Sequence, residues 1–190
     1  MEKTMLQRAI EFAAVKHGGT PRKGTDIPYI VHPIEVMKIV AGITDDEEVR
    51  AAAVLHDTIE DTDASREELE ELFGKRVAEL VASESENKRK GQAETETWFL
   101  RKQETLDRLE KADRDTKIIC LGDKLANMRD IARDYESLGD KLWERFNAPD
   151  DKKTNIGWYY KGIAERLAGE LGDTNAWKEL DRLIAVVFDN

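Results

Sequence analysis

One histidine and three carboxylates lie close together in the stretch AAAVLHDTIEDT, residues 51–62. If this stretch is helical, at about 100° per residue, a single arc of roughly 140° holds His56, Asp57, Glu60 and Asp61. Apolar residues occupy the neighbouring arc, so the ionisable groups are expected next to a hydrophobic core. Ionisable groups in such surroundings need a compensating charge, which a divalent cation would supply.

Two further residues are candidate partners for such a cation. His32 precedes Pro33, which suits the first position of a helix. Asp123 follows Gly122 at a point where an apolar helical pattern over residues 115–133 is interrupted. A lone buried histidine is more often a satisfied core residue than a ligand, and His32 is weighed against that reading. A site of two histidines and two carboxylates suits a transition metal better than magnesium, which prefers oxygen ligands.

The elements that must position these residues are helical. Apolar periodicity and helix-end signals predict helices at about 3–16, 33–42, 44–62, 65–74, 77–81, 98–109, 115–133, 138–146, 157–171 and 174–188. Thr44 with Glu47 and Ser65 with Glu68 fit capping boxes. Residues 83–96 are polar and are expected to form a loop. No stretch is typical of a strand, so the predicted fold is an all-α helical bundle around one polar centre.

Composition excludes several classes of protein. The net charge of −10 argues against general nucleic-acid binding, because no dominant basic field is available to displace counterions from phosphates. No stretch reaches the 18 apolar residues of a membrane helix, and no signal-peptide core is present at the start. The single cysteine, Cys120, excludes disulfides within the chain. We therefore expect a cytoplasmic protein with no membrane partner.

Three motifs, taken in order, carry a resemblance. RKGTDIPYIVHP, AAVLHDTIEDT and LGDKLANMRDI resemble the hydrolase domain of the RelA/SpoT family, within the HD metal-dependent phosphohydrolases, and the small stand-alone alarmone hydrolases match in size. The likeness is strong over residues 6–134 and fainter in the late helix WYYKGIAERL. It implies one HD-type domain over residues 1–190, with core motifs at 6–134 and C-terminal helices at 137–188. No synthetase domain is expected to follow.

The resemblance also implies residue roles. The metal ligands would be His32, His56, Asp57 and Asp123. The metal of the family is usually manganese, with other divalent transition metals left open. Glu60 and Asp61 would be the catalytic acidic pair. The substrate-binding residues would be Arg22, Lys23, Asn127 and Tyr160. An ordinary surface amide remains the alternative for Asn127, and core packing is an equal alternative for Tyr160.

The implied reaction is removal of the 3′-pyrophosphate from guanosine tetra- or pentaphosphate, (p)ppGpp. Where family hydrolases often have Val-Thr-Asp-Asp, this chain has VASESENKRK, so the substrate is less firmly predicted than the hydrolysis. One alternative is a phosphatase on another phosphorylated nucleotide, such as a nicotinamide dinucleotide phosphate. Another is a nucleotide-binding sensor or an antitoxin-like partner. A homo-oligomer is left open.

Overall fold

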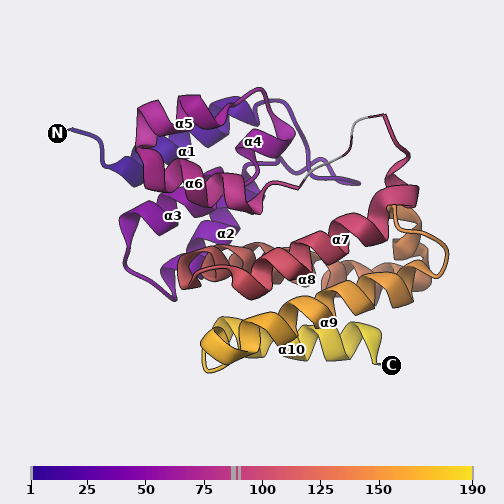
Figure 1. Cartoon of the computed structure of the whole chain (residues 1–190). Helices are drawn as coiled ribbons and strands as arrows, with labels where there is room; N and C mark the ends of the chain where they lie inside the picture. The colour runs from indigo at the N-terminus through magenta and orange to yellow at the C-terminus, as the bar shows by residue number, and fades with distance from the viewer. Residues whose placement is uncertain (1, 87–88, 90, 190) are drawn as a thin grey trace. The chain divides into compact units, whose positions relative to one another are not determined.

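The computed structural model describes residues 2–86, 89 and 91–189. Helices joined by loops make up this part of the chain (Figure 1). Within it, the β-type structure is an isolated antiparallel bridge between Pro21 and Pro28. The prediction of an all-α fold is therefore confirmed. None of the helices in the described ranges has both the length and the hydropathy needed to cross a lipid bilayer.

The chain divides into two compact units, which are described separately. The first unit comprises Met1–Ser85 and Ile118–Ala126. Its helices are α1 (Met5–Lys16), α2 (Val31–Ala41), α3 (Glu47–Leu55), α4 (Thr58–Asp61), α5 (Arg66–Phe73), α6 (Lys75–Glu84) and the middle of α8 (Arg114–Leu138). The second unit comprises Glu86–Lys117 and Asn127–Asn190. It contains α7 (Glu94–Lys111), the two ends of α8, the 3₁₀ segment η1 (Gly139–Arg145), α9 (Lys152–Leu171) and α10 (Asn175–Phe188). A single domain over residues 1–190 stays a prediction.

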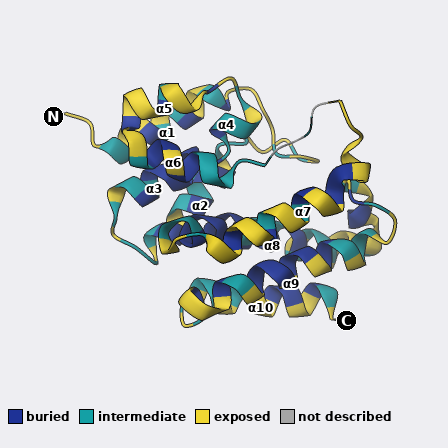
Figure 2. Ribbon diagram, viewed as in Figure 1, coloured by how far each residue is buried: buried dark blue, intermediate teal, exposed yellow. Residues whose placement is uncertain are grey.

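Helix α3 is the centre of the first unit. It packs against α1, α2 and α6. Residues 51–55 are completely buried, which Figure 2 shows as dark blue ribbon. Three consecutive alanines, Ala51 to Ala53, keep this helix narrow, so that helices can approach it on several sides. The last residue of α3, Leu55, is therefore fixed deep in the core immediately before His56.

Helix α3 begins later than the sequence predicted. The N-cap is Asp46, whose carboxylate accepts hydrogen bonds from the backbone N–H groups of Glu48 (2.9 Å) and Val49 (3.3 Å). The Thr44 hydroxyl instead accepts from the N–H of Asp46 at 3.2 Å. The predicted capping box of Thr44 with Glu47 was wrong, because Asp46 is a stronger cap than Thr44 and lies closer to the apolar run.

The helix predicted over residues 44–62 is interrupted at His56 and Asp57. Helix α3 ends at Leu55, and His56 and Asp57 form a turn before the single turn of α4. The His56 ring nitrogen Nδ1 lies 2.9 Å from the Ala53 carbonyl, and the Thr58 hydroxyl donates to the Leu55 carbonyl at 2.7 Å. These side chains use carbonyls that a continuing helix would need, which explains the break.

Other helix ends agree with the sequence or shift by a few residues. Ser65 caps α5 by accepting from the N–H of Glu68 at 3.1 Å, as predicted, and Thr174 caps α10. Helix α2 begins at Val31, so His32 lies inside its first turn rather than before it. The predicted 83–96 loop was too long, because α6 reaches Glu84 and α7 begins at Glu94. Within this segment, positions 87, 88 and 90 fall outside the described residues.

Gly122 explains the interruption in the apolar pattern of α8. The helix is continuous there, and the absence of a side chain allows close packing against α2. A Cβ atom at this position would lie 2.9 Å from Val40 Cγ2, 3.2 Å from Val36 Cγ1 and 3.2 Å from the Val36 carbonyl oxygen. Glycine thus brings the next residue, Asp123, close to the first turn of α2.

Replacing this glycine tests the close approach. We expect Gly122→Ala to lower the free energy of unfolding by about 1–3 kcal/mol, because part of the clash is with backbone. Gly169→Ala in α9 is the matched control, since a Cβ there meets nothing within 4 Å. The control should be neutral or stabilising, by up to about 1 kcal/mol. Urea unfolding of both variants gives the comparison, and equal stability of Gly122→Ala and the parent would contradict the packing argument.

Candidate metal centre

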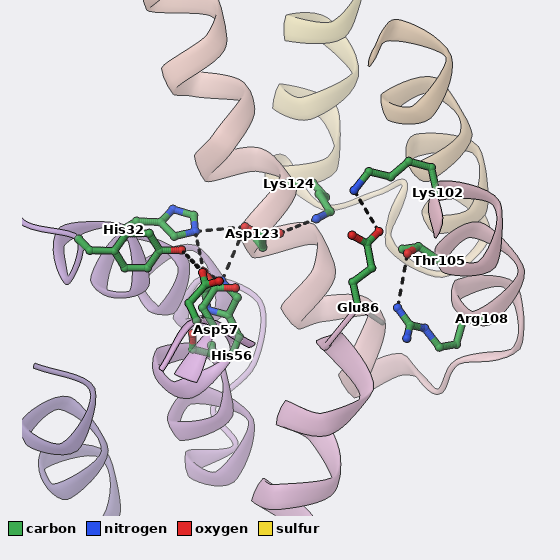
Figure 3. A network of polar contacts seen from close by, with 12 residues as sticks. His32, His56, Asp57, Glu86, Lys102, Thr105, Arg108, Asp123 and Lys124 are labelled. Carbon is green, nitrogen blue, oxygen red and sulfur yellow. Dashed lines mark hydrogen bonds and ion pairs between the residues drawn. The ribbon is translucent and has the colours of Figure 1, made fainter. Parts of the chain in front are cut away.

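Three segments of the first unit bring four ionisable side chains to one point. His32 comes from the first turn of α2, His56 and Asp57 from the turn between α3 and α4, and Asp123 from the middle of α8. Figure 3 shows these side chains pointing toward one another. His32, His56 and Asp123 are each less than a tenth exposed. The structure therefore assembles all four side chains that the sequence selected as ligands.

The distances suit a shared cation. His32 Nε2 lies 3.2 Å from Asp123 Oδ1 and 3.7 Å from Asp57 Oδ2. His56 Nε2 lies 3.0 Å from Asp57 Oδ2 and 3.7 Å from Asp123 Oδ1. Donor atoms of His32, His56 and Asp57 all fall within 4.8 Å of one another, a group that could hold a metal ion.

The orientation of His56 supports a cation at this point. Its Nδ1 faces the Ala53 carbonyl, an acceptor, so Nδ1 carries the hydrogen and Nε2 has the free lone pair. Although Asp57 Oδ2 is near, no group in the described part of the chain has hydrogen-bond geometry with the buried Nε2. A lone pair that faces carboxylate oxygens needs a cation or a proton between them. Holding a ring through its other nitrogen is the usual arrangement for a metal-binding histidine.

The charges in the cluster shift its protonation. Burial alone would raise the pKa of Asp57, but the nearby His56 holds that pKa below its ordinary value. Burial opposes ionisation of Asp123 as well, and the ammonium group of Lys124, 2.6 Å away, contributes to a pKa well below normal. Burial lowers the pKa of His56, yet the two carboxylates outweigh burial and raise it well above 6.5. A divalent cation would therefore compete with a proton for this site.

Two neighbours of the cluster were not given a role from the sequence. The Tyr29 hydroxyl donates to Asp57 Oδ2 at 2.6 Å, and burial together with the adjacent carboxylates raises its pKa, so it stays a donor. Lys124 pairs with Asp123. The available signal for Tyr29 was its position three residues before His32, about one turn away at the start of α2.

The predicted acidic pair lies beside the cluster, on α4. Glu60 is half-buried and Asp61 is exposed. Asp61 Oδ2 lies 3.2 Å from the Tyr29 hydroxyl, which is also bonded to Asp57. The pair is therefore on the same short segment as His56 and Asp57, and Asp61 shares a hydrogen-bonding neighbour with Asp57.

The predicted substrate-binding residues fall in both units. In the first, the Arg22 guanidinium lies 5.7 Å from the centre of the Tyr29 ring, and Lys23 is exposed. In the second, Asn127 is half-buried on α8, and Tyr160 is buried, with its ring stacked at 6.3 Å on Phe188. Arg22 thus contacts the Tyr29 ring, and the Tyr29 hydroxyl in turn donates to Asp57 of the histidine–aspartate cluster. Substrate contact by any of these residues stays a prediction.

The fold and the site define an all-helical protein with a histidine–aspartate centre suited to a divalent metal. A family model described as "HD domain" matches residues 9–148. The chain therefore belongs to the HD domain family.

Several curated relatives are named for the same activity, while others are named GTP pyrophosphokinase rsh. The guanosine-3′,5′-bis(diphosphate) 3′-pyrophosphohydrolase MESH1 of Danio rerio is 39% identical over 132 residues, which are 68% of this chain and 70% of the relative. MESH1 of Mus musculus is 40% identical over 136 residues, 70% of this chain and 72% of the relative. The Aquifex aeolicus protein named guanosine-3′,5′-bis(diphosphate) 3′-pyrophosphohydrolase is 54% identical over 76 residues, but these cover only 40% of this chain and 11% of that protein.

Two solved structures are similar to this chain over most of its length. A metazoan orthologue of SpoT, described as hydrolysing ppGpp, has a TM-score of 0.79 and 29% identity, covering 98% of this chain and 97% of the other. The crystal structure of lmo0812 from Listeria monocytogenes has a TM-score of 0.71 and 30% identity, covering 86% of this chain and 97% of the other.

Metal addition tests the centre directly. A divalent ion at 100 times its dissociation constant should stabilise the native state by about 2.7 kcal/mol and raise the melting temperature by roughly 5–10 °C. Asp123→Asn should lose most of this rise, because it removes one of the charges that face the ion. Asp130→Asn, on the same helix outside the cluster, should keep it. Differential scanning calorimetry with and without Mn²⁺ makes the measurement, and equal rises in both variants would exclude Asp123 as a ligand.

Proposed function

We propose that this protein is a manganese-dependent hydrolase that removes the 3′-pyrophosphate from guanosine tetra- or pentaphosphate, leaving GDP or GTP. One observation carries the proposal: His32, His56, Asp57 and Asp123 converge at a buried point in a chain that aligns with pyrophosphohydrolases over two thirds of its length. The proposal includes a cytoplasmic location. Absence of nucleic-acid binding stays a prediction.

The four cluster residues would hold the cation. A divalent ion held there would supply positive charge for the phosphoryl oxygens and would lower the pKa of a bound water strongly, to about 7 in favourable sites. The Ala53 carbonyl keeps the lone pair of His56 Nε2 directed at the centre. Glycine at position 122 lets Asp123 approach from α8. The protein's own contribution is therefore a buried, preorganised set of two imidazoles and two carboxylates.

Glu60 and Asp61 would orient the attacking water and accept its proton. They lie one helical turn beyond His56 and Asp57, on a segment that remains accessible to solvent. Arg22 would contact the nucleotide, since its guanidinium is planar, permanently charged and close to the cluster through Tyr29. The exposed Lys23 would add a second cation for the phosphates. Asn127 and Tyr160 are proposed as further contacts to the nucleotide.

Product analysis tests the substrate. Incubation of Mn²⁺-loaded protein with guanosine tetraphosphate should release one pyrophosphate and one GDP for each molecule consumed. Guanosine pentaphosphate, nicotinamide dinucleotide phosphate and GTP should be run beside it, with phosphate and pyrophosphate measured separately. Orthophosphate release from one of the other nucleotides, with no reaction of the guanosine 3′-pyrophosphates, would assign the protein to another phosphatase activity.

The acidic pair separates catalysis from binding. We expect Glu60→Gln and Asp61→Asn each to lower kcat by about 10²- to 10⁴-fold, because each removes a group that can take a proton. Nucleotide affinity, measured by equilibrium dialysis, should change little. Glu71→Gln, an exposed substitution on α5, is the control. If cells carrying both substitutions keep the function of the parent protein although hydrolysis is lost, a nucleotide sensor is favoured over an enzyme.

A further inference from the structure

The Tyr29 hydroxyl connects two carboxylates that have different proposed roles. It donates to Asp57 Oδ2 at 2.6 Å and lies 3.2 Å from Asp61 Oδ2. We propose that Tyr29 is a positioning residue that aligns the metal ligand Asp57 with the catalytic carboxylate Asp61. The part that concerns Asp61 rests on the proposed function, whereas the part that concerns Asp57 requires only metal binding.

The chemistry of a hydroxyl suits this place. A hydroxyl offers one hydrogen and two lone pairs, so Tyr29 can donate to only one carboxylate at a time. The length of the bond to Asp57 is that of a charge-assisted hydrogen bond, which is stronger and more directional than a neutral one. Such a bond restricts rotation of the Asp57 carboxylate and leaves its remaining lone pairs for a cation. The Asp61 carboxylate lies within hydrogen-bond distance of the same hydroxyl, at 3.2 Å.

The ring of Tyr29 is held on several sides. The His17 ring lies against it, with centroids 4.7 Å apart and planes inclined by 33°, and the His32 ring meets it edge-on at 5.9 Å. The Arg22 guanidinium covers it at 5.7 Å. Its backbone N–H donates to the Thr20 carbonyl at 2.8 Å. These contacts fix the hydroxyl relative to α4, and all except the hydroxyl's own bonds survive replacement by phenylalanine.

His17 supports the Tyr29 ring but buries a ring nitrogen that has no hydrogen-bond partner among the described residues. It is 4% exposed, and among the described residues no group hydrogen-bonds its Nε2. Burying an unsatisfied polar atom is unfavourable, so apolar replacement should lose no hydrogen bond at Nε2. What His17→Leu would remove is the flat ring that supports Tyr29.

Tyr29→Phe tests the inference with two independent measurements. Calorimetric titration of metal-free protein with Mn²⁺ should show an affinity about 10-fold or more below the parent, the usual scale for losing a hydrogen bond to a metal ligand. With guanosine tetraphosphate as substrate, kcat should fall by about 10-fold or more, and KM should stay within about twofold. Tyr135→Phe, which removes a tyrosine hydroxyl from α8 in the second unit, should change neither quantity. Unchanged Mn²⁺ affinity and kcat in folded Tyr29→Phe would overturn the inference.

The outcomes separate this inference from the proposed function. If the parent protein is inert on guanosine tetraphosphate but Tyr29→Phe binds Mn²⁺ more weakly, the proposed function fails and the link from Tyr29 to Asp57 stands. If the parent is active and Tyr29→Phe equals it in both Mn²⁺ affinity and kcat, the proposed function stands and the inference about Tyr29 fails. Circular dichroism verifies folding. If Tyr29→Phe does not fold, His17→Leu provides the test, because it leaves the Tyr29 hydroxyl in place but removes the ring that supports it. We expect His17→Leu to lower the Mn²⁺ affinity and kcat by a smaller factor than Tyr29→Phe. Unchanged Mn²⁺ affinity and kcat in His17→Leu would contradict the inference.

Discussion

The structure of the first unit depends on bringing two carboxylates and two imidazoles together out of water. With neutral histidines the four groups carry two negative charges, of which Lys124 offsets one. Such a set is unfavourable in a hydrophobic interior unless a cation compensates it. The surrounding core keeps the arrangement from relaxing, since α3 is packed on several sides and its last residues are fully buried. Affinity for a divalent ion is therefore a consequence of how the helices are packed.

The residues of the cluster and most of the helices could be predicted from the sequence. The four residues of the cluster could be selected from the sequence, because one histidine precedes a proline, a histidine–aspartate pair ends an apolar run, and an aspartate follows a glycine. Their role as metal ligands stays a prediction. The helices were predictable because their periodicity is strong and their caps, such as Ser65 and Thr174, are conventional.

The remaining features depend on contacts that periodicity does not encode. The break after Leu55 arises from side-chain hydrogen bonds of His56 and Thr58 to nearby carbonyls, which compete with a helix by small free-energy differences. Gly122 was visible as an irregularity, but its reason is the distance between α8 and α2. The position of the Tyr29 hydroxyl near Asp57 and Asp61 depends on a tertiary contact between the loop before α2 and the segment around α4.

The shortness of α4 has a consequence for the acidic pair. Two main-chain hydrogen bonds close this turn, from Asp61 N–H to the Asp57 carbonyl at 2.9 Å and from Thr62 N–H to the Thr58 carbonyl at 3.1 Å. A lone turn is at the nucleation stage of a helix, where the entropy of ordering the backbone outweighs what so few bonds return. The ordering of Glu60 and Asp61 must therefore come from tertiary contacts, such as the hydrogen bond from the Tyr29 hydroxyl to Asp61, so the position of this segment depends on the packing of the first unit.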